Sequence, residues 1–338
     1  MSHHTPARNN GTCMTLPSKK MLLAVALMIV VLLLVVGACL LFFSGSGSAS
    51  VPATGETTGK LQVITSFRPI TLLVLPVAGD YAQVTQLLPP GAEPHEYEPT
   101  PADAMTLARG KILFYDGPAM EPWAENLADA ANPEITRVSF ISAVPPGVLA
   151  QMKSTNPAFP DMSQDPHLWL SPPLAEYFVS SVADQLAAAD PANATGYHQN
   201  AEAFEARLKK LDHEYAIDLA NCTTRTFLTS HAFLDYQAAA YNLTALSITG
   251  LSPDAEPSVR QMAEVLNESR EDNVQGVLAE TDEVQALSQS AATELDLPVY
   301  SYDTMEILPA GPENQSESDY VTVMEQNLGQ MRQALQCR

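Results

Sequence analysis

Three of the seven histidines lie in short segments suited to metal binding. Imidazole nitrogens bind zinc and other transition metals, and loops beside proline or small residues often present such ligands. His95, His167 and His231 are separated by 72 and 64 residues, so only the fold can bring them together. Asp165 is predicted to cap a turn, from which it could also orient the imidazole ring of His167. The three segments are Pro94–Pro101, Asp165–Leu170 and Thr229–Phe233.

The elements around these histidines alternate between short apolar strands and helices, which predicts parallel sheets. Ligands in such sheets lie beyond the carboxyl ends of the strands, where His95 is expected. Residues 193–219 carry the longest uninterrupted helical pattern, with apolar residues three or four positions apart. Strands are expected at residues 61–67, 81–88, 111–115, 136–140, 226–229, 243–248, 276–280 and 299–302.

The N-terminal part contains a segment suited to crossing a membrane. Residues 21–43 carry no charged side chain, and about 20 apolar residues span a bilayer as a helix. Lys19 and Lys20 precede this apolar segment. Basic residues mark the cytoplasmic side, so residues 1–20 are predicted to lie in the cytoplasm and the rest of the chain outside. Residues 44–59 are rich in Ser and Gly and predict a flexible linker. Cys39 lies in a sequence that loosely resembles a lipoprotein cleavage site, so lipidation is an alternative to an uncleaved anchor.

The remainder is too long for one ordinary core and predicts two lobes. We expect an α/β protein in which each lobe has a mostly parallel sheet flanked by helices. The N-terminal metal-binding lobe is predicted over residues 60–192, a long rigid connecting helix over residues 193–220, and the C-terminal metal-binding lobe over residues 221–338. His95 and His167 belong to the first lobe and His231 to the second, so a shared metal ion would lie in the cleft between them.

Charge and cysteine content narrow the possible partners. The formal net charge is −22 at pH 7, which argues against nucleic acid as a partner. Cys222 and Cys337 are the two cysteines of the globular body. An external compartment permits disulfides, and we expect these two residues to be paired. The body is expected to be monomeric.

Four ordered motifs resemble the metal-specific solute-binding proteins of ABC transporters, the cluster A-I type that contains zinc and manganese receptors. The resemblance extends over residues 61–335 and implies two α/β lobes joined by a long helix. The motifs are Gly91–Asp103, Asp165–Pro172, Thr229–Phe233 and Gly250–Ser258.

The resemblance also implies a ligand set. His95, His167 and His231 match the three imidazole positions of the family, and Asp303 matches its carboxylate ligand. Asp303 follows the last predicted strand, and Glu280, at the end of the strand before it, is the competing fourth ligand. Three imidazoles and one carboxylate suit tetrahedral Zn²⁺, and Mn²⁺ is the alternative because it prefers sites richer in oxygen. Two departures from the family are Ser171, where Asp is frequent, and a segment 141–164 that lacks histidine.

The resemblance implies a substrate-binding component that captures Zn²⁺ outside the cytoplasm and delivers it to an ABC permease driven by an ATPase. Such a protein is not an enzyme. A secreted zinc hydrolase is the alternative, but it needs an open coordination position and usually an H-E-x-x-H helix, which this sequence lacks. An adhesin or a metal-storage protein on the same scaffold is a third interpretation.

Overall fold

The computed structural model describes the globular body of the chain. The segments predicted as a cytoplasmic end, a membrane span and most of a linker lie outside the described residues, as does Cys39. Among the described helices, none combines the length and the apolarity that a bilayer crossing requires. The described residues are 59–154, 156, 162, 164–253, 255–280, 285–308 and 319–338.

The first lobe contains a four-stranded parallel sheet in the order β2-β1-β3-β4. Strand β3 is buried along its whole length, which explains its continuous apolar sequence Ile-Leu-Phe-Tyr. Helix α2 begins with Arg68 and Pro69, and proline is favoured at this position because its missing N–H would have no helical partner. The elements are β1 (Leu61–Thr65), α2 (Arg68–Ala78), β2 (Ala82–Gln86), α3 (Pro101–Leu107), β3 (Ile112–Tyr115), α4 (Ala124–Ala131) and β4 (Thr136–Ser139).

The second lobe repeats this arrangement with the parallel strand order β6-β5-β7-β8. Helix α10 begins with a capping box in which Ser258 and Gln261 each accept a hydrogen bond from the other's backbone N–H. The elements are β5 (Thr226–Thr229), α9 (Asp235–Ala240), β6 (Thr244–Ser247), α10 (Val259–Glu271), β7 (Val277–Glu280), α11 (Gln285–Leu295), β8 (Val299–Tyr302) and α12 (Tyr320–Ala334). The two α/β lobes with parallel sheets predicted from the sequence are therefore confirmed.

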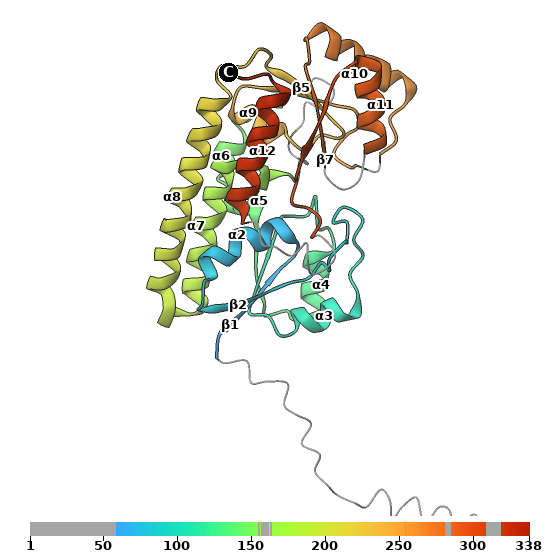
Figure 1. Cartoon of the computed structure of the whole chain (residues 1–338). Helices are drawn as coiled ribbons and strands as arrows, with labels where there is room; N and C mark the ends of the chain where they lie inside the picture. Colours follow the sequence, from blue (N-terminus) through green and yellow to red (C-terminus); the bar gives the residue numbers. More distant parts are fainter. Residues whose placement is uncertain are drawn as a thin grey trace, which may run out of the picture. The chain divides into compact units, whose positions relative to one another are not determined.

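Helix α8 (Ala194–Asp218) leads from the first lobe to the second and does not stand alone. It packs along α7 (Pro172–Ala189) and also contacts α2 and α12, and Figure 1 shows α7 and α8 side by side. Tyr215 illustrates the contact, because its buried hydroxyl donates to the backbone carbonyl of Met324 on α12 at 2.7 Å. The connecting helix is thus held on several sides, which restricts its bending.

The segment 141–164, predicted as a loop, contains short helices. Helix α5 (Phe140–Ala143) and helix α6 (Pro146–Leu149) are each a single turn, too short for periodicity to reveal. Two short 3₁₀ turns, η1 (Leu168–Leu170) and η2 (Pro191–Asn193), precede α7 and α8.

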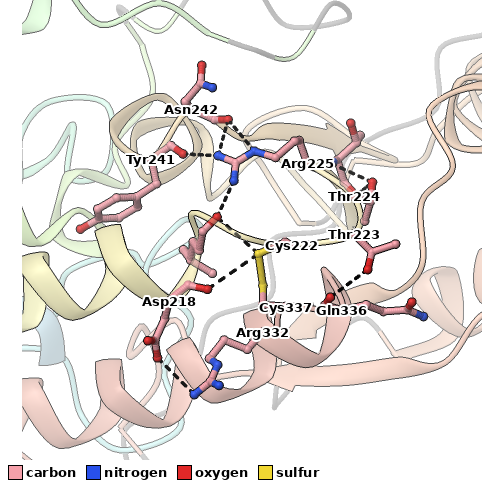
Figure 2. The surroundings of a disulfide bond; sticks show 12 residues. Asp218, Cys222, Thr223, Thr224, Arg225, Tyr241, Asn242, Arg332, Gln336 and Cys337 are labelled. Carbon is pink, nitrogen blue, oxygen red and sulfur yellow. Dashed lines mark hydrogen bonds and ion pairs between the residues drawn. A yellow bond between two sulfur atoms is a disulfide. The ribbon is translucent and has the colours of Figure 1, made fainter.

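The predicted pairing of Cys222 with Cys337 is confirmed, and it joins the start of the second lobe to the end of the chain (Figure 2). The bond lies at the end of α8, before strand β5 begins. An ion pair between Arg332 and Asp218 at 3.1 Å adds a second tie between α12 and α8. Arg225 donates to the backbone carbonyl of Leu219, just after α8, and to those of Tyr241 and Asn242, just after α9. Covalent and charged contacts therefore hold α8, α9 and α12 at one end of the second lobe.

Candidate metal centre

Three imidazoles and one carboxylate converge between the two sheets. Potential ligand atoms of His95, His167, His231 and Glu306 all lie within 4.8 Å of one another. His167 and His231 are fully buried, and the side chains of His95 and Glu306 are 10% and 5% exposed. The structure therefore brings the three predicted histidines together with a carboxylate that the sequence reasoning missed.

His95 lies on the loop that follows strand β2, and acidic side chains hold this loop at both ends. Glu93 accepts a hydrogen bond from the backbone N–H of His95 at 3.1 Å. Asp103, in the first turn of α3, accepts from the backbone N–H and hydroxyl of Thr100 and from the hydroxyl of Tyr97 at 2.6–2.8 Å. These hydrogen bonds fix the end of the loop just before helix α3 begins. His95 therefore lies on a loop that is held by hydrogen bonds on both sides of it.

Asp165 fixes the orientation of His167. Its Oδ1 atom accepts the backbone N–H of His167 at 2.9 Å and lies 2.7 Å from the ring Nδ1. The predicted turn cap and ring-orienting role coincide in one carboxylate. Because Nδ1 is engaged by Asp165, Nε2 is the nitrogen left to face the site.

His231 follows strand β5 by two residues, at the carboxyl end of the second sheet. The hydroxyl of Thr229 donates to the backbone carbonyl of His231 at 2.7 Å, which fixes the turn. Glu280, the alternative fourth ligand, ends strand β7 and places Oε2 3.4 Å from His231 Nδ1. This carboxylate faces the nitrogen of His231 that points away from His167, and Glu280 is not in the converging group.

Asp303 is likewise not in that group. Its carboxylate pairs with Arg68 Nη1 at 3.2 Å, and its Oδ1 also accepts the backbone N–H of Met305 at 2.7 Å. Met305 has φ of +64°, a left-handed conformation that turns the chain after β8. This turn brings Glu306, the residue that follows Met305, to the histidines. The available signal was that Glu306 closely follows the last strand, at the edge where His231 follows β5.

Three of the distances between the converging atoms are close to those of a tetrahedral site, and every pair in the group lies within 4.8 Å. Ligands at about 2.0–2.1 Å from a tetrahedral zinc ion lie about 3.3 Å from one another. His167 Nε2 is 3.4 Å from His231 Nε2, His95 Nε2 is 3.5 Å from Glu306 Oε2, and His167 Nε2 is 3.6 Å from Glu306 Oε1. Binding of a four-coordinate ion would draw any wider pairs of these atoms, which are at most 4.8 Å apart, to about this distance.

The environment favours neutral imidazoles, the form that binds a metal. Burial lowers the pKa of His167 well below its ordinary value, and nearby His95 adds to the shift. Burial also lowers the pKa of His231 strongly, with further contributions from His167 and His95. Both rings are therefore uncharged at neutral pH and can offer a lone pair without first releasing a proton.

Further buried carboxyl groups lie around the histidines. Burial raises the pKa of Asp165 to about 7, against the hydrogen bond from His167 that lowers it. Burial and the charge of Glu121 raise the pKa of Asp116 well above its usual range. A divalent ion bound by one carboxylate and three neutral rings would carry a net positive charge, which favours loss of the protons from these acids so that their negative charge compensates it.

A comparison with protein families identifies the group to which the chain belongs. The family described as "Zinc-uptake complex component A periplasmic", ZnuA, matches residues 63–334. The chain is a member of the ZnuA family. The resemblance inferred from the four sequence motifs is therefore confirmed. Because the match begins within β1 and ends at the last residue of α12, family membership extends over both lobes.

Curated relatives of this ZnuA-family chain carry zinc binding or zinc uptake in their names. The zinc-binding lipoprotein AdcA of Streptococcus pneumoniae strain R6 is 31% identical over 82% of this chain, which spans 56% of the relative's length. The high-affinity zinc uptake system protein ZnuA of Bacillus subtilis strain 168 is 29% identical over 87% of this chain and 94% of its own length. The chain thus matches one relative almost from end to end and about half of the other.

Solved structures agree with this family assignment. The Zn(II)-bound ZnuA-like domain of Streptococcus pneumoniae AdcA has a TM-score of 0.67 and 31% identity, covering 82% of this chain and 99% of that domain. The laminin-binding protein Lmb of Streptococcus agalactiae, described as having adhesin and metal transporting activity, has a TM-score of 0.71 and 26% identity, covering 82% of this chain and 99% of its own. The two-lobed fold is therefore shared.

Proposed function

We propose that this protein is the extracytoplasmic zinc-binding component of a metal ABC uptake system. The observation that carries the proposal is the convergence of three imidazoles and the Glu306 carboxylate within 4.8 Å, with three of the distances at 3.4–3.6 Å. The names of the zinc-binding relatives support the same cargo. In this proposal Zn²⁺ is bound by His95, His167, His231 and Glu306.

The donor set supports zinc over manganese. Three nitrogen donors and one carboxylate suit tetrahedral Zn²⁺, whereas Mn²⁺ prefers oxygen ligands and a larger coordination number. Copper binds such ligands more tightly still by intrinsic affinity, so cargo selection also depends on metal availability. Manganese remains the competing cargo in the experiment below.

The same donor set argues for holding a metal and against using it in catalysis. A hydrolytic zinc ion keeps one position open for water, and a general base lies close to that water. Four protein ligands would fill the coordination sphere of zinc. We therefore propose a binding protein and not a hydrolase.

The division of the ligands between lobes suggests how the cargo is released. His95 and His167 come from the first lobe, while His231 and Glu306 follow strands of the second sheet. Separation of the lobes would divide the ligand set into two pairs and weaken the site. We propose that docking to a permease, energised by an ATPase, drives this separation.

The proposed location follows from the same role. A component that collects metal for uptake must lie outside the cytoplasm, and the predicted span over residues 21–43 would anchor it to the membrane. Lipidation at Cys39 is the alternative anchor. Mass spectrometry of the mature protein distinguishes the two, because lipoprotein processing would leave Cys39 as an acylated first residue.

Metal content and competition test the proposal directly. The full chain, purified in mild detergent because of its predicted span, is compared with His231→Ala and with His213→Ala, which changes an exposed histidine on α8. We expect one zinc ion per chain, retained in excess Mn²⁺, in the wild type and in His213→Ala, and its loss in His231→Ala. If Mn²⁺ displaces the zinc, manganese and not zinc is the cargo. Equal metal content in all three proteins would refute the proposed site.

A further inference from the structure

Glu306 lies on a short segment that leaves the second sheet and contacts both lobes. We call residues Asp303–Leu308 the Glu306 strap. Its first residue is fixed to the second lobe, because Asp303 N–H donates to Asn327 Oδ1 at 2.9 Å and Asn327 Nδ2 donates to the Asp303 carbonyl at 2.7 Å. Asn327 is buried on α12. The strap therefore starts from a fixed point on the second lobe.

Beyond this point the strap is attached to the first lobe. Trp169 Nε1 donates to the carbonyl of Thr304 at 2.8 Å. The backbone N–H of Gly91, on the loop that carries His95, donates to the carbonyl of Leu308 at 2.9 Å. The proposed carboxylate ligand thus lies between two attachments to the opposite lobe.

Arg68 makes the third attachment and holds the strap on both sides of Glu306. Its Nη1 atom lies 3.2 Å and 3.4 Å from the two carboxylate oxygens of Asp303 and 3.5 Å from the carbonyl of Ile307. The side chains of Arg68 and Asp303 are 12% and 32% exposed. Of these three attachments, only the one made by Arg68 joins opposite charges.

The position of Arg68 suggests that its contact with Asp303 matters. Arg68 is the first residue of α2, where the helix dipole is positive and disfavours a cation. An acidic partner offsets that disadvantage. Asp303 is already oriented by its hydrogen bond from Met305 N–H, so little side-chain freedom is lost when it pairs with Arg68.

We propose that the Arg68–Asp303 ion pair is an interlobe latch that slows metal release by holding the Glu306 strap against the first lobe. This inference rests on the proposed function, because it concerns the same metal. Opening of the cleft must break the latch before Glu306 can move away from His95 and His167. Loss of the latch favours the opened arrangement, so the rate of metal dissociation rises while metal association is not slowed.

The test measures zinc dissociation into excess chelator from the full chain loaded with one zinc ion. Arg68→Gln removes the cation. Asp303→Asn removes the anion but keeps an oxygen that can accept from Met305 N–H. Each variant should still bind one zinc ion and release it about two- to tenfold faster, the range for one partly exposed charged contact. Arg68→Lys, which keeps the charge, should restore part of the slow release.

A double variant and a matched control separate the latch from general destabilisation. Because both substitutions break one contact, Arg68→Gln with Asp303→Asn should release zinc no faster than the faster single variant. The control is Arg207→Gln, which removes a different ion pair: Arg207 on α8 lies 2.8 Å from Asp319, the residue before α12. This variant should release zinc at the wild-type rate.

The latch is overturned if both single variants release zinc at the wild-type rate, if their effects multiply in the double variant, or if Arg207→Gln accelerates release equally. If Arg68→Gln does not fold, judged by circular dichroism, Asp303→Asn and Arg68→Lys decide the matter. Failure of the wild-type protein to bind zinc would instead refute the proposed function. The two failures are therefore distinguishable.

Discussion

His167 Nε2 lies 3.4 Å from His231 Nε2, although the two residues are 64 positions apart and belong to different lobes. A carboxylate lies near the other nitrogen of each ring, Asp165 at 2.7 Å from His167 Nδ1 and Glu280 at 3.4 Å from His231 Nδ1. Two buried nitrogen atoms at this distance repel if both carry lone pairs, and a shared cation removes the repulsion. The metal is therefore expected to hold the lobes together.

Glu306 and Asp303 can be separated by substitution. Loss of a residue that only hydrogen-bonds a metal ligand lowers metal affinity by about 10- to 100-fold. Glu306→Gln removes the proposed anionic ligand itself, so we expect zinc affinity to fall by at least about 100-fold. Asp303→Asn should lower affinity by no more than about tenfold, because it breaks only a partly exposed ion pair. Competition with a chelator of known affinity measures both. A larger loss in Asp303→Asn would return Asp303 to the ligand set.

Asp165→Ala tests the orientation of His167. The substitution removes the acceptor of both the backbone N–H and the ring Nδ1, and we expect zinc affinity to fall about 10- to 100-fold. Asp165→Asn retains an oxygen acceptor and should recover part of the affinity. Asp212→Asn, which changes the partner of the Tyr241 hydroxyl, is the control and should bind zinc normally. Isothermal titration of the three variants gives the comparison, and wild-type affinity in Asp165→Ala would exclude the role.

The disulfide is expected to stabilise the fold without affecting the metal. Replacing Cys222 and Cys337 together by Ser should lower the free energy of unfolding by about 2–4 kcal/mol. The bond closes a long loop, because the two cysteines are 115 residues apart in sequence. Zinc stoichiometry should stay at one, because Cys222 precedes β5 whereas His231 follows it. Urea unfolding and metal analysis are the measurements. Loss of zinc in a folded double variant would contradict this separation.

Asp235 should make stability depend on pH. Burial, followed by the charge of Asp165, raises the pKa of Asp235 to about 8, compared with about 3.9 in an unfolded chain. Between about pH 4 and 8 the folded protein therefore keeps a proton that the unfolded chain has released. The free energy of unfolding of the metal-free protein should fall as pH rises through this window.

Asp235→Asn removes this contribution. Relative to the wild type, the variant should gain stability steadily from pH 4 to 8 and no further above pH 8. Urea unfolding at several pH values, with chelator present so that metal does not contribute, measures the difference. Parallel pH profiles for the two proteins would show that Asp235 does not bind this proton.

Much of the fold could be predicted because apolar patterns mark its elements directly. Strands β5 and β8 have the predicted bounds, and the three histidines meet because each follows a strand or a turn at the same edge. The position of Glu306 could not be predicted this way. It depends on the positive φ of Met305 and on contacts of Asp303 with Arg68 and Asn327, which belong to distant helices. Such tertiary contacts leave no local pattern in the sequence.

The equal division of the proposed ligands has a consequence for the chemical form of the cargo. In an opened molecule, either lobe would hold the ion through only two protein atoms, His95 and His167 or His231 and Glu306. Water would have to complete the coordination sphere of a four-coordinate ion. The ion would then leave the protein partly hydrated, and the next binding site would have to remove that water.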